Sequence, residues 1–484
     1  MSISSALNAA LSGLTATARR AEVVSSNVAN AATPGYGRRE VQLSSGLLGG
    51  LVAGVNVNGV SRKEDLMLLG QRREAQAGLA EAEVRAGFLA GIEGAIGLPG
   101  EPGSLTERLT AFETALIEAA SRPDSEGRLT GVAQTAGAVA DKLNALSDRV
   151  QDERLQADRG IAEAVGDLNT AMERVVELNT KIIQFSGSTR DASALADERQ
   201  RVIDGIAELI PVRQVARPNG AVALYSPGGA LLVDSKAAEL GFTGVPALTV
   251  HMTQAGGGLS GLTLNGQPVT TGSANGPISG GRLAALFDLR DSLGPDIQTQ
   301  LDAVARNLVE RFENPAVDPT LGAGDPGLFT DNGLALDLSE ELGLAGRISL
   351  NALADPDQGG AVWRIRDGLG AAAVGDPGDA SLLNALSAAL AQETVPGSGV
   401  FTASRGAVGL AGDLLSFVST SAYGAEARVS HARAQSDALV TAELQDGVDT
   451  DQEMQELLLV EQAYAANARV MSTLDEMLQQ LLRL

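Results

Sequence analysis

Histidine and cysteine, which supply most of the nucleophilic and metal-binding chemistry of proteins, are almost missing from this sequence. Its 484 residues include two histidines, His251 and His431, and no cysteine. The chain therefore has no disulfide, thiolate metal site, iron–sulfur cluster or cysteine nucleophile. A serine–histidine–aspartate triad would need one of the two histidines, and the sequence has no G-x-S-x-G nucleophile elbow. We predict that both histidines are structural and partly exposed.

Two further patterns match ligand sites only in part. Residues 256–261 read G-G-G-L-S-G, but a dinucleotide-binding G-x-G-x-x-G requires a helix directly after it. The residues that follow, 262–266, indicate a strand and a turn, so we expect a hairpin loop. The acidic turns at 355–357 and 375–379 lack the ligand spacing of a calcium-binding loop and are expected at the surface. The sequence thus predicts no catalytic residue, no cofactor, no metal site and no enzyme activity.

The composition points in the same direction. Against 36 lysines and arginines stand 60 aspartates and glutamates, and the net charge of −24 opposes nucleic-acid binding. Aromatic residues make up only 3% of the chain, which leaves few large anchors for a ligand pocket. No apolar stretch approaches the ~20 residues of a membrane span. No basic region precedes the uncharged residues 1–18, so we expect neither membrane insertion nor a cleaved signal peptide.

The chain is predicted to be mainly α-helical, with an inserted β domain and a nested organisation. Helical periodicity covers both ends and long internal stretches, whereas short β-rich runs between glycine turns fill 212–281. The final helical block, 404–484, has one break at Asp446-Gly447. Residues 43–61 indicate a loop with a short strand or two. We expect a terminal helical stem (1–45 with 448–484), a helical bundle (46–211, 282–314 and 401–447), a β-rich outer domain (212–281) and a loop-rich α+β segment (315–400).

Both ends carry heptad-like apolar seams that favour a coiled-coil-like stem. The first seam ends at Thr33-Pro34-Gly35, where a helix is expected to stop. The second follows a capping-box pattern at 450–453 and contains one polar residue, Asn467, of the kind that fixes helix register. The predicted assembly seam consists of Ile3, Leu7, Leu14, Val24, Val28, Leu457, Val460, Tyr464, Asn467, Met471, Leu474, Leu478 and Leu481.

The N-terminal seam is too small to hold a helix by itself. Few of its residues are large, so their burial cannot offset the conformational entropy of about 30 ordered residues. The C-terminal segment is a suitable partner, because residues 448–484 carry a net charge of −5 and residues 1–40 a net charge of +2. The pair could be an intramolecular stem, a stem that folds on packing against other subunits, or a membrane-surface helix. We favour the second, because small alanine faces on both helices leave apolar surface for further neighbours. The scarcity of Lys, Trp and Phe weakens the third.

Short motifs at both ends resemble those of the bacterial flagellar axial proteins, which include rod, hook and hook-associated proteins. Near the N-terminus these are A-L-S-G-L (10–14), S-S-N-V-A-N (25–30) and T-P-G-Y (33–36); near the C-terminus they are E-Q-A-Y (461–464) and D-E-M-L (475–478). Internal runs at 193–200, 281–290 and 348–351 are similar to the hook-associated members. The residues taken as the family motif are Asn27, Asn30, Thr33, Pro34, Gly35 and Tyr36.

This resemblance implies an extracellular structural protein at the junction between flagellar hook and filament, exported unfolded by the flagellar type III system. It implies that the terminal helices form an inner tube, the middle helices a second shell and the β domain the outer surface. It also implies self-association in a ring, contacts with the hook protein and with the next hook-associated or filament proteins, and an export chaperone on the C-terminal helix. The alternatives are another axial component, such as a divergent hook protein, and a secreted hydrolase, which would need paired acids in a concave site.

Overall fold

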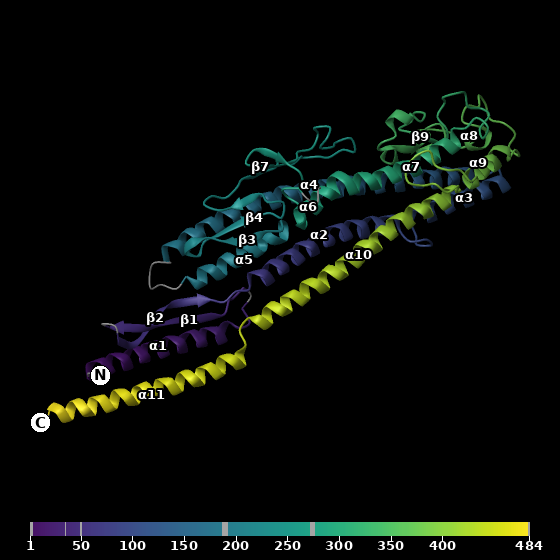
Figure 1. The fold of residues 1–484 in the computed structure, drawn as a ribbon. Helices are drawn as coiled ribbons and strands as arrows, with labels where there is room; N and C mark the ends of the chain where they lie inside the picture. Colours follow the sequence, from purple (N-terminus) through teal and green to yellow (C-terminus); the bar gives the residue numbers. More distant parts are fainter. Residues whose placement is uncertain (1–2, 34, 49–50, 186–191, 272–275, 483–484) are drawn as a thin grey trace.

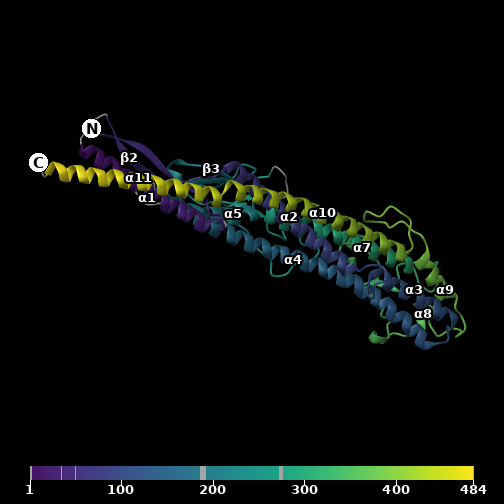
Figure 2. The ribbon, with the colours of Figure 1, turned by 90° about the horizontal axis from the view of Figure 1, so that it is seen from below.

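The computed structural model describes residues 3–33, 35–48, 51–185, 192–271 and 276–482. The molecule is elongated and mainly helical, and the N- and C-termini lie together at one end of its long axis (Figures 1 and 2). Within the described residues, no helix is long and apolar enough to cross a membrane. The predicted fold class, mainly α with small inserted β-sheets, is confirmed.

The stem, which contains both termini, consists of two helices and a hairpin. Helices α1 (Ile3–Asn30) and α11 (Thr450–Leu482) run side by side, and the antiparallel strands β1 (Arg39–Leu48) and β2 (Leu51–Arg62) lie on the other side of α1 (Figure 1). Strands of 10 and 12 residues thus replace the loop with short strands that the sequence predicts at 43–61.

The hairpin is longer than predicted because α1 supports it. At Gly54, which has φ +105°, an added Cβ would lie 3.1 Å from the Cα of Ala9, so the strand backbone approaches the helix closely. The next residue, Val55, donates its N–H to Ser12 Oγ at 3.1 Å. Such support from another element is invisible in the local pattern of 43–61.

The body is a bundle of long helices. Helix α2 (Leu66–Ile96) packs along α10 (Ala407–Asp446), while α4 (Glu126–Phe185) packs against α3 (Leu105–Ser121) and α5 (Ser193–Leu209). The 60 residues of α4 contain no proline, and buried side chains recur at helical spacing from Leu129 to Ile182. Helices α10 and α11 separate at Asp446-Gly447, so the predicted break is confirmed.

A further helical run packs along the bundle and contains an irregular turn. Helix α6 (Gly281–Asp288), a π-helical turn (Leu289–Leu293) and α7 (Gly294–Phe312) follow one another without a loop. The π turn carries Arg290, which is fully buried and donates from Nη1 to Asp158 Oδ1 of α4 at 2.7 Å. This buried ion pair joins the run to α4.

Two three-stranded antiparallel sheets lie along α4 (Figure 1). The strands are β3 (Arg213–Ala216), β4 (Val222–Tyr225), β5 (Leu231–Val233), β6 (Leu240–Gly241), β7 (Leu262–Leu264) and β8 (Gln267–Val269). Side chains of α4 bind this segment: Asn179 Nδ2 donates to the Val222 carbonyl and Asn169 Nδ2 to the Leu240 carbonyl, each at 2.8 Å. The Gly-rich run at 256–261 lies in the loop before β7, and no helix follows it.

The end of the molecule far from the termini holds short elements around an aromatic core. Strand β9 (Phe329–Asp331) pairs with β10 (Ile348–Leu350), next to α8 (Arg364–Asp367), α9 (Ser381–Ala391) and several 3₁₀ turns. The rings of Phe112, Phe312 and Phe329 have centroids 5.4 to 5.9 Å apart. They join α3, α7 and β9 in one core.

Candidate assembly interface

The residues of the predicted seam differ widely in exposure along the α1–α11 pair. Three apolar members are buried: Val24, Val460 and Leu474. Seven are partly buried: Leu7, Leu14, Val28, Leu457, Asn467, Met471 and Leu478. Tyr464 is 50% exposed, and the side chains of Ile3 and Leu481 lie outside the described residues. The role of the set in assembly stays a prediction.

One contact between the helices fixes their register. An added Cβ on Gly13 would lie 2.9 Å from both Oδ1 and Nδ2 of Asn467, so the asparagine occupies the space that only glycine leaves free. Gly13 belongs to the A-L-S-G-L motif, and Asn467 is the polar residue of the C-terminal seam. A register shift of α11 would move this side chain against larger residues of α1.

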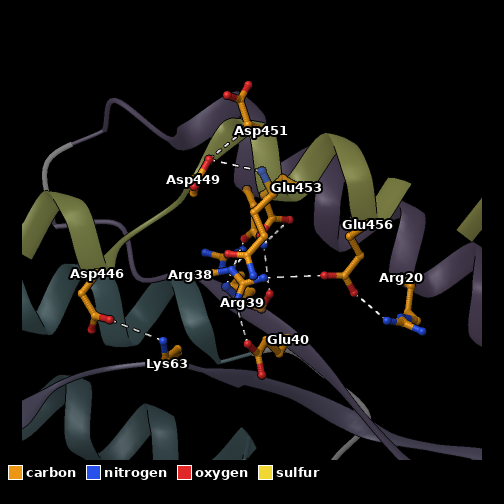
Figure 3. Close-up of polar contacts among 12 residues, drawn as sticks. Arg20, Arg38, Arg39, Glu40, Lys63, Asp446, Asp449, Asp451, Glu453 and Glu456 are labelled. Atoms are coloured by element: carbon orange, nitrogen blue, oxygen red, sulfur yellow. Dashed lines mark hydrogen bonds and ion pairs between the residues drawn. The ribbon is translucent and has the colours of Figure 1, made fainter. Parts of the chain in front are cut away.

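A buried ion pair lies where the stem meets the body (Figure 3). Glu453, in the first turn of α11, is completely buried; its Oε1 accepts from Arg38 Nε at 2.7 Å and its Oε2 from Asn27 Nδ2 at 3.0 Å. Burial disfavours the charged form of Arg38, but the hydrogen bond and charge of Glu453 outweigh it and raise the arginine pKa. Removing either partner would leave a buried charge uncompensated, so the pair makes the docked position of α11 specific.

The start of α11 differs from the predicted capping box. Asp449, not Thr450, caps the helix, because its Oδ1 accepts from the N–H groups of Asp451 at 2.9 Å and Gln452 at 3.2 Å (Figure 3). The capping-box pattern assigns Glu453 to the backbone N–H of Thr450, but its carboxylate accepts from Arg38 instead. Its charge still lies in the first turn, where the helix dipole favours an anion.

A second carboxylate of α11 extends this contact along the stem. Glu456 Oε1 accepts from Arg20 Nη2 at 2.6 Å, and its Oε2 lies 3.6 Å from Arg38 Nη2 (Figure 3). The side chains of Arg20 and Glu456 are 42% and 29% exposed, so solvent screens this pair more than the buried one. Arg38 thus connects two carboxylates of α11.

Asn27 of the family motif organises the turn after α1. It is 1% exposed; its Oδ1 accepts from the Arg39 N–H at 3.0 Å and the Tyr36 hydroxyl at 2.9 Å, while Nδ2 donates to the Arg39 carbonyl at 3.0 Å. An amide side chain offers donors and an acceptor on separate atoms, as these contacts require. Burial raises the pKa of the Tyr36 phenol, although a hydrogen bond with Ser26 opposes this.

The other motif residues shape the chain between α1 and β1. Asn30 Nδ2 donates to the Ser26 carbonyl at 2.9 Å, and Thr33 Oγ1 donates to Asn30 Oδ1 at 3.4 Å. Gly35 has φ +76°, and an added Cβ would lie 2.8 Å from Arg201 Cγ, so both backbone and packing require glycine. Pro34 lies outside the described residues.

Asp197 of α5 links the stem to the body. Its Oδ1 accepts from the Gly37 N–H at 3.2 Å and lies 2.8 Å from Arg62 Nε, and its Oδ2 accepts from Arg39 Nη2 at 2.9 Å. Sequence analysis identified neither this carboxylate nor the pairing of Arg38 with Glu453. The sequence shows the basic pair Arg38-Arg39 and the acidic first turn of α11, but it does not show which residue either of them contacts.

Helix α11 also presents apolar side chains that α1 does not cover. They are between 47% and 86% exposed: Met454, Leu458, Leu459, Tyr464, Val470, Met477 and Leu482. A helix with apolar residues on more than one side has surface for further neighbours. No group of three metal-ligating side chains occurs among the described residues. The exposed side chains of α11 are therefore arranged to pack against further apolar surfaces.

Three family models match successive parts of the chain. The flagellar hook-associated protein FlgK helical domain matches residues 91–316, the flagella basal body rod protein matches 7–36, and the flagellar basal body rod FlgEFG protein C-terminal region matches 445–484. The two terminal matches cover α1 and α11, and the central match covers most of the helical body and the two sheets.

Proteins with flagellar hook-associated or hook junction names are similar to this chain. The flagellar hook-associated protein 1 of Bacillus subtilis is 24% identical over 96% of this chain and 96% of its own length. The protein of that name from Salmonella typhimurium is 25% identical over 49% of this chain, and the match spans 44% of the relative's length. The flagellar hook junction protein FlgK from Burkholderia pseudomallei is 19% identical, with a TM-score of 0.43 over 55% of this chain and 47% of that one.

The helical-domain match lies between the two rod-type terminal matches, and the Bacillus subtilis relative aligns with this chain along nearly its whole length. The chain is therefore similar to flagellar hook-associated protein 1 (FlgK) along nearly its whole length, and this similarity supports a structural component of the bacterial flagellum rather than an enzyme.

Proposed function

We propose that this chain forms the junction between the flagellar hook and the filament. The observation that carries the proposal is the incomplete packing of the stem. Helix α11 is docked on α1 by a buried ion pair and a close glycine contact, but it leaves Leu458, Leu459 and Leu482 more than half exposed. Neighbouring subunits that pack on this face would complete the stem.

In this proposal copies of the chain assemble in a ring through the terminal helices, between the hook protein and the next hook-associated or filament proteins. The proposed domain division has a stem of 1–45 with 448–484, which the β1–β2 hairpin extends to residue 62. The rest of 46–211 forms a bundle with 282–314 and 401–447, residues 212–281 form a β-rich layer and residues 315–400 a distal segment. The seam residues form the contacts within and between stems.

The chain reaches this place, in the proposal, through the flagellar type III export channel as an unfolded polypeptide. The weakly packed α11 supports this, because an element with few buried side chains opens at low cost. Before export, the same apolar face is available to a chaperone that binds the C-terminal helix.

The test is deletion of the coding sequence in the bacterium, followed by electron microscopy of isolated flagella. We expect completed hooks without filaments, and restoration of filaments by the full-length chain. Antibody labelling should place the chain at the hook's distal end. Filaments of normal length in the deletion strain would contradict the proposal, as would labelling along the whole hook, which would indicate a hook protein.

A further inference from the structure

The helices of the body contain glycines that their folded surroundings do not require. Among the described residues, eleven glycines inside α2, α4, α5 and α10 have open space where a Cβ would lie, and none of them has a positive φ. Neither packing nor backbone conformation therefore calls for glycine at these positions. Five of them are also exposed to solvent: Gly78, Gly87, Gly94, Gly166 and Gly205.

Each of the five exposed glycines weakens its helix. Glycine loses more backbone freedom on folding than alanine does. In an exposed helix interior it lowers the ratio of folded to unfolded protein roughly twofold to fivefold relative to alanine. Because an added methyl group at each site touches nothing within 4 Å, the effects of five alanines should add. Together they would change that ratio on the order of 100-fold.

The stem helices contain no glycine of this kind. Helix α11 has no glycine among its 33 residues, and the one glycine of α1 is Gly13, whose missing Cβ leaves the space that Asn467 occupies. The unexplained glycines of the described helices thus lie in the body, whose large apolar core contains no residue of the stem helices. The region with the most complete core carries the substitutions that weaken helices.

This distribution matches the different ease with which the two regions unfold. The stem opens at low cost, because α11 buries few side chains. The body has a complete core, and every long helix in it must unfold before the chain can be threaded through a narrow channel. An exposed glycine lowers the stability of such a helix without leaving a cavity in the core or an apolar group on the surface.

We propose that the exposed helix glycines keep the folded body easy to unfold and so allow its export. This inference rests on the export of an unfolded chain proposed above. Export of a body that has folded depends on the population of unfolded chains or on the rate of forced unfolding. Stabilising the native helices lowers the first and usually the second.

The test replaces the five exposed glycines by alanine in one protein. We expect the main thermal transition of the purified variant to rise by about 3–6 °C. In the deletion strain, with the variant synthesised at the wild-type level, we expect several-fold less chain in the flagella and culture fluid and more inside the cells. Calorimetry and quantitative immunoblots of the two fractions measure these effects.

A rescue variant separates stability from the identity of the glycines. Phe312→Ala opens a cavity in the aromatic core of α3, α7 and β9, outside the helices that carry the five sites. Added to the five alanines, it should return the melting temperature towards the wild-type value and restore export. The matched control is Gln134→Ala with Gln156→Ala, two exposed sites of α4 at which helix propensity hardly changes. It should alter neither melting nor export.

The other outcomes would overturn the proposal. Normal export of the stabilised protein would show that body stability does not limit export. Normal export with missing filaments would assign the glycines to the close approach of a neighbouring subunit instead. Failure of Phe312→Ala to restore export, although it restores the melting temperature, would also contradict the proposal. The proposed function is judged separately, because it fails if filaments form in the strain that lacks the whole chain.

Discussion

The stem and the body differ in how far the folded chain covers its own apolar surface. Helix α4 of the body has 22 buried residues among 60, whereas the described part of α11 has three, Glu453, Val460 and Leu474. The exposed apolar side chains of α11 outnumber them. The body has therefore completed its core within one chain, and the stem has not. The predictions below test this contrast, from the largest expected effect to the smallest.

Removing α11 should have opposite effects on the two regions: filament assembly is lost, but the stability of the body is kept. Deletion of 450–484 is expected to abolish filaments, because the neighbours lose the surface on which they pack. The body should keep its melting temperature within about 1–2 °C, since few buried side chains are lost. Electron microscopy of cells and calorimetry of the purified protein measure the two effects. A large fall in melting temperature with normal filaments would reverse the roles of stem and body.

Truncating one core side chain in each region should give opposite patterns. Phe312→Ala is expected to lower the free energy of unfolding by about 3–5 kcal/mol, because it opens a cavity beside Phe112 and Phe329. Leu474→Ala should leave the main thermal transition unchanged but shorten filaments. Calorimetry and filament length, measured for both variants, provide the comparison. Equal destabilisation by both would show that stem and body unfold as one unit.

Loosening the buried ion pair should open the stem without affecting the body. Glu453→Gln keeps the shape of the side chain but leaves the buried Arg38 without its closest charge partner. We expect amide hydrogen exchange in α11 to become roughly tenfold faster or more, while α4 exchanges as before. Glu461→Gln, an exposed site on the same helix, is the control. Unchanged exchange in α11 would mean that the pair contributes little to docking.

The smallest effect is expected from a buried acid of the body. Burial raises the pKa of Asp302, although the N–H groups of Ala345 and Gly343 oppose this. A carboxyl whose pKa is raised by folding stabilises the protein below its unfolded pKa of about 3.9, and this stabilisation is lost as the pH rises through the folded value. Asp302→Asn should lack this component, so wild type should lose stability relative to the variant over that range in urea titrations. A parallel pH dependence of both proteins would rule it out.

Much of the fold follows from the sequence, because its long helices carry their own periodicity. The helices, the break at Gly447 and the β-rich runs after Pro211 are all visible in spacing and punctuation. The β1–β2 hairpin was underestimated because its support comes from α1. The ion pair of Arg38 with Glu453 could not be predicted, since 415 residues separate the partners and the local pattern assigns Glu453 to a capping box.

The attachment of stem to body has a mechanical consequence. The chain crosses between them twice, at 63–65 after β2 and at 447–449 before α11, and the two crossings lie side by side, with Lys63 Nζ 3.4 Å from Asp446 Oδ1. Two short crossings next to each other form a hinge that lets the body rotate against the stem about one axis. The contacts of Asp197 with Gly37 and Arg39 limit this rotation. A long body on such a hinge can tilt as a whole, so a small rotation at the stem becomes a large displacement at the far end of the body.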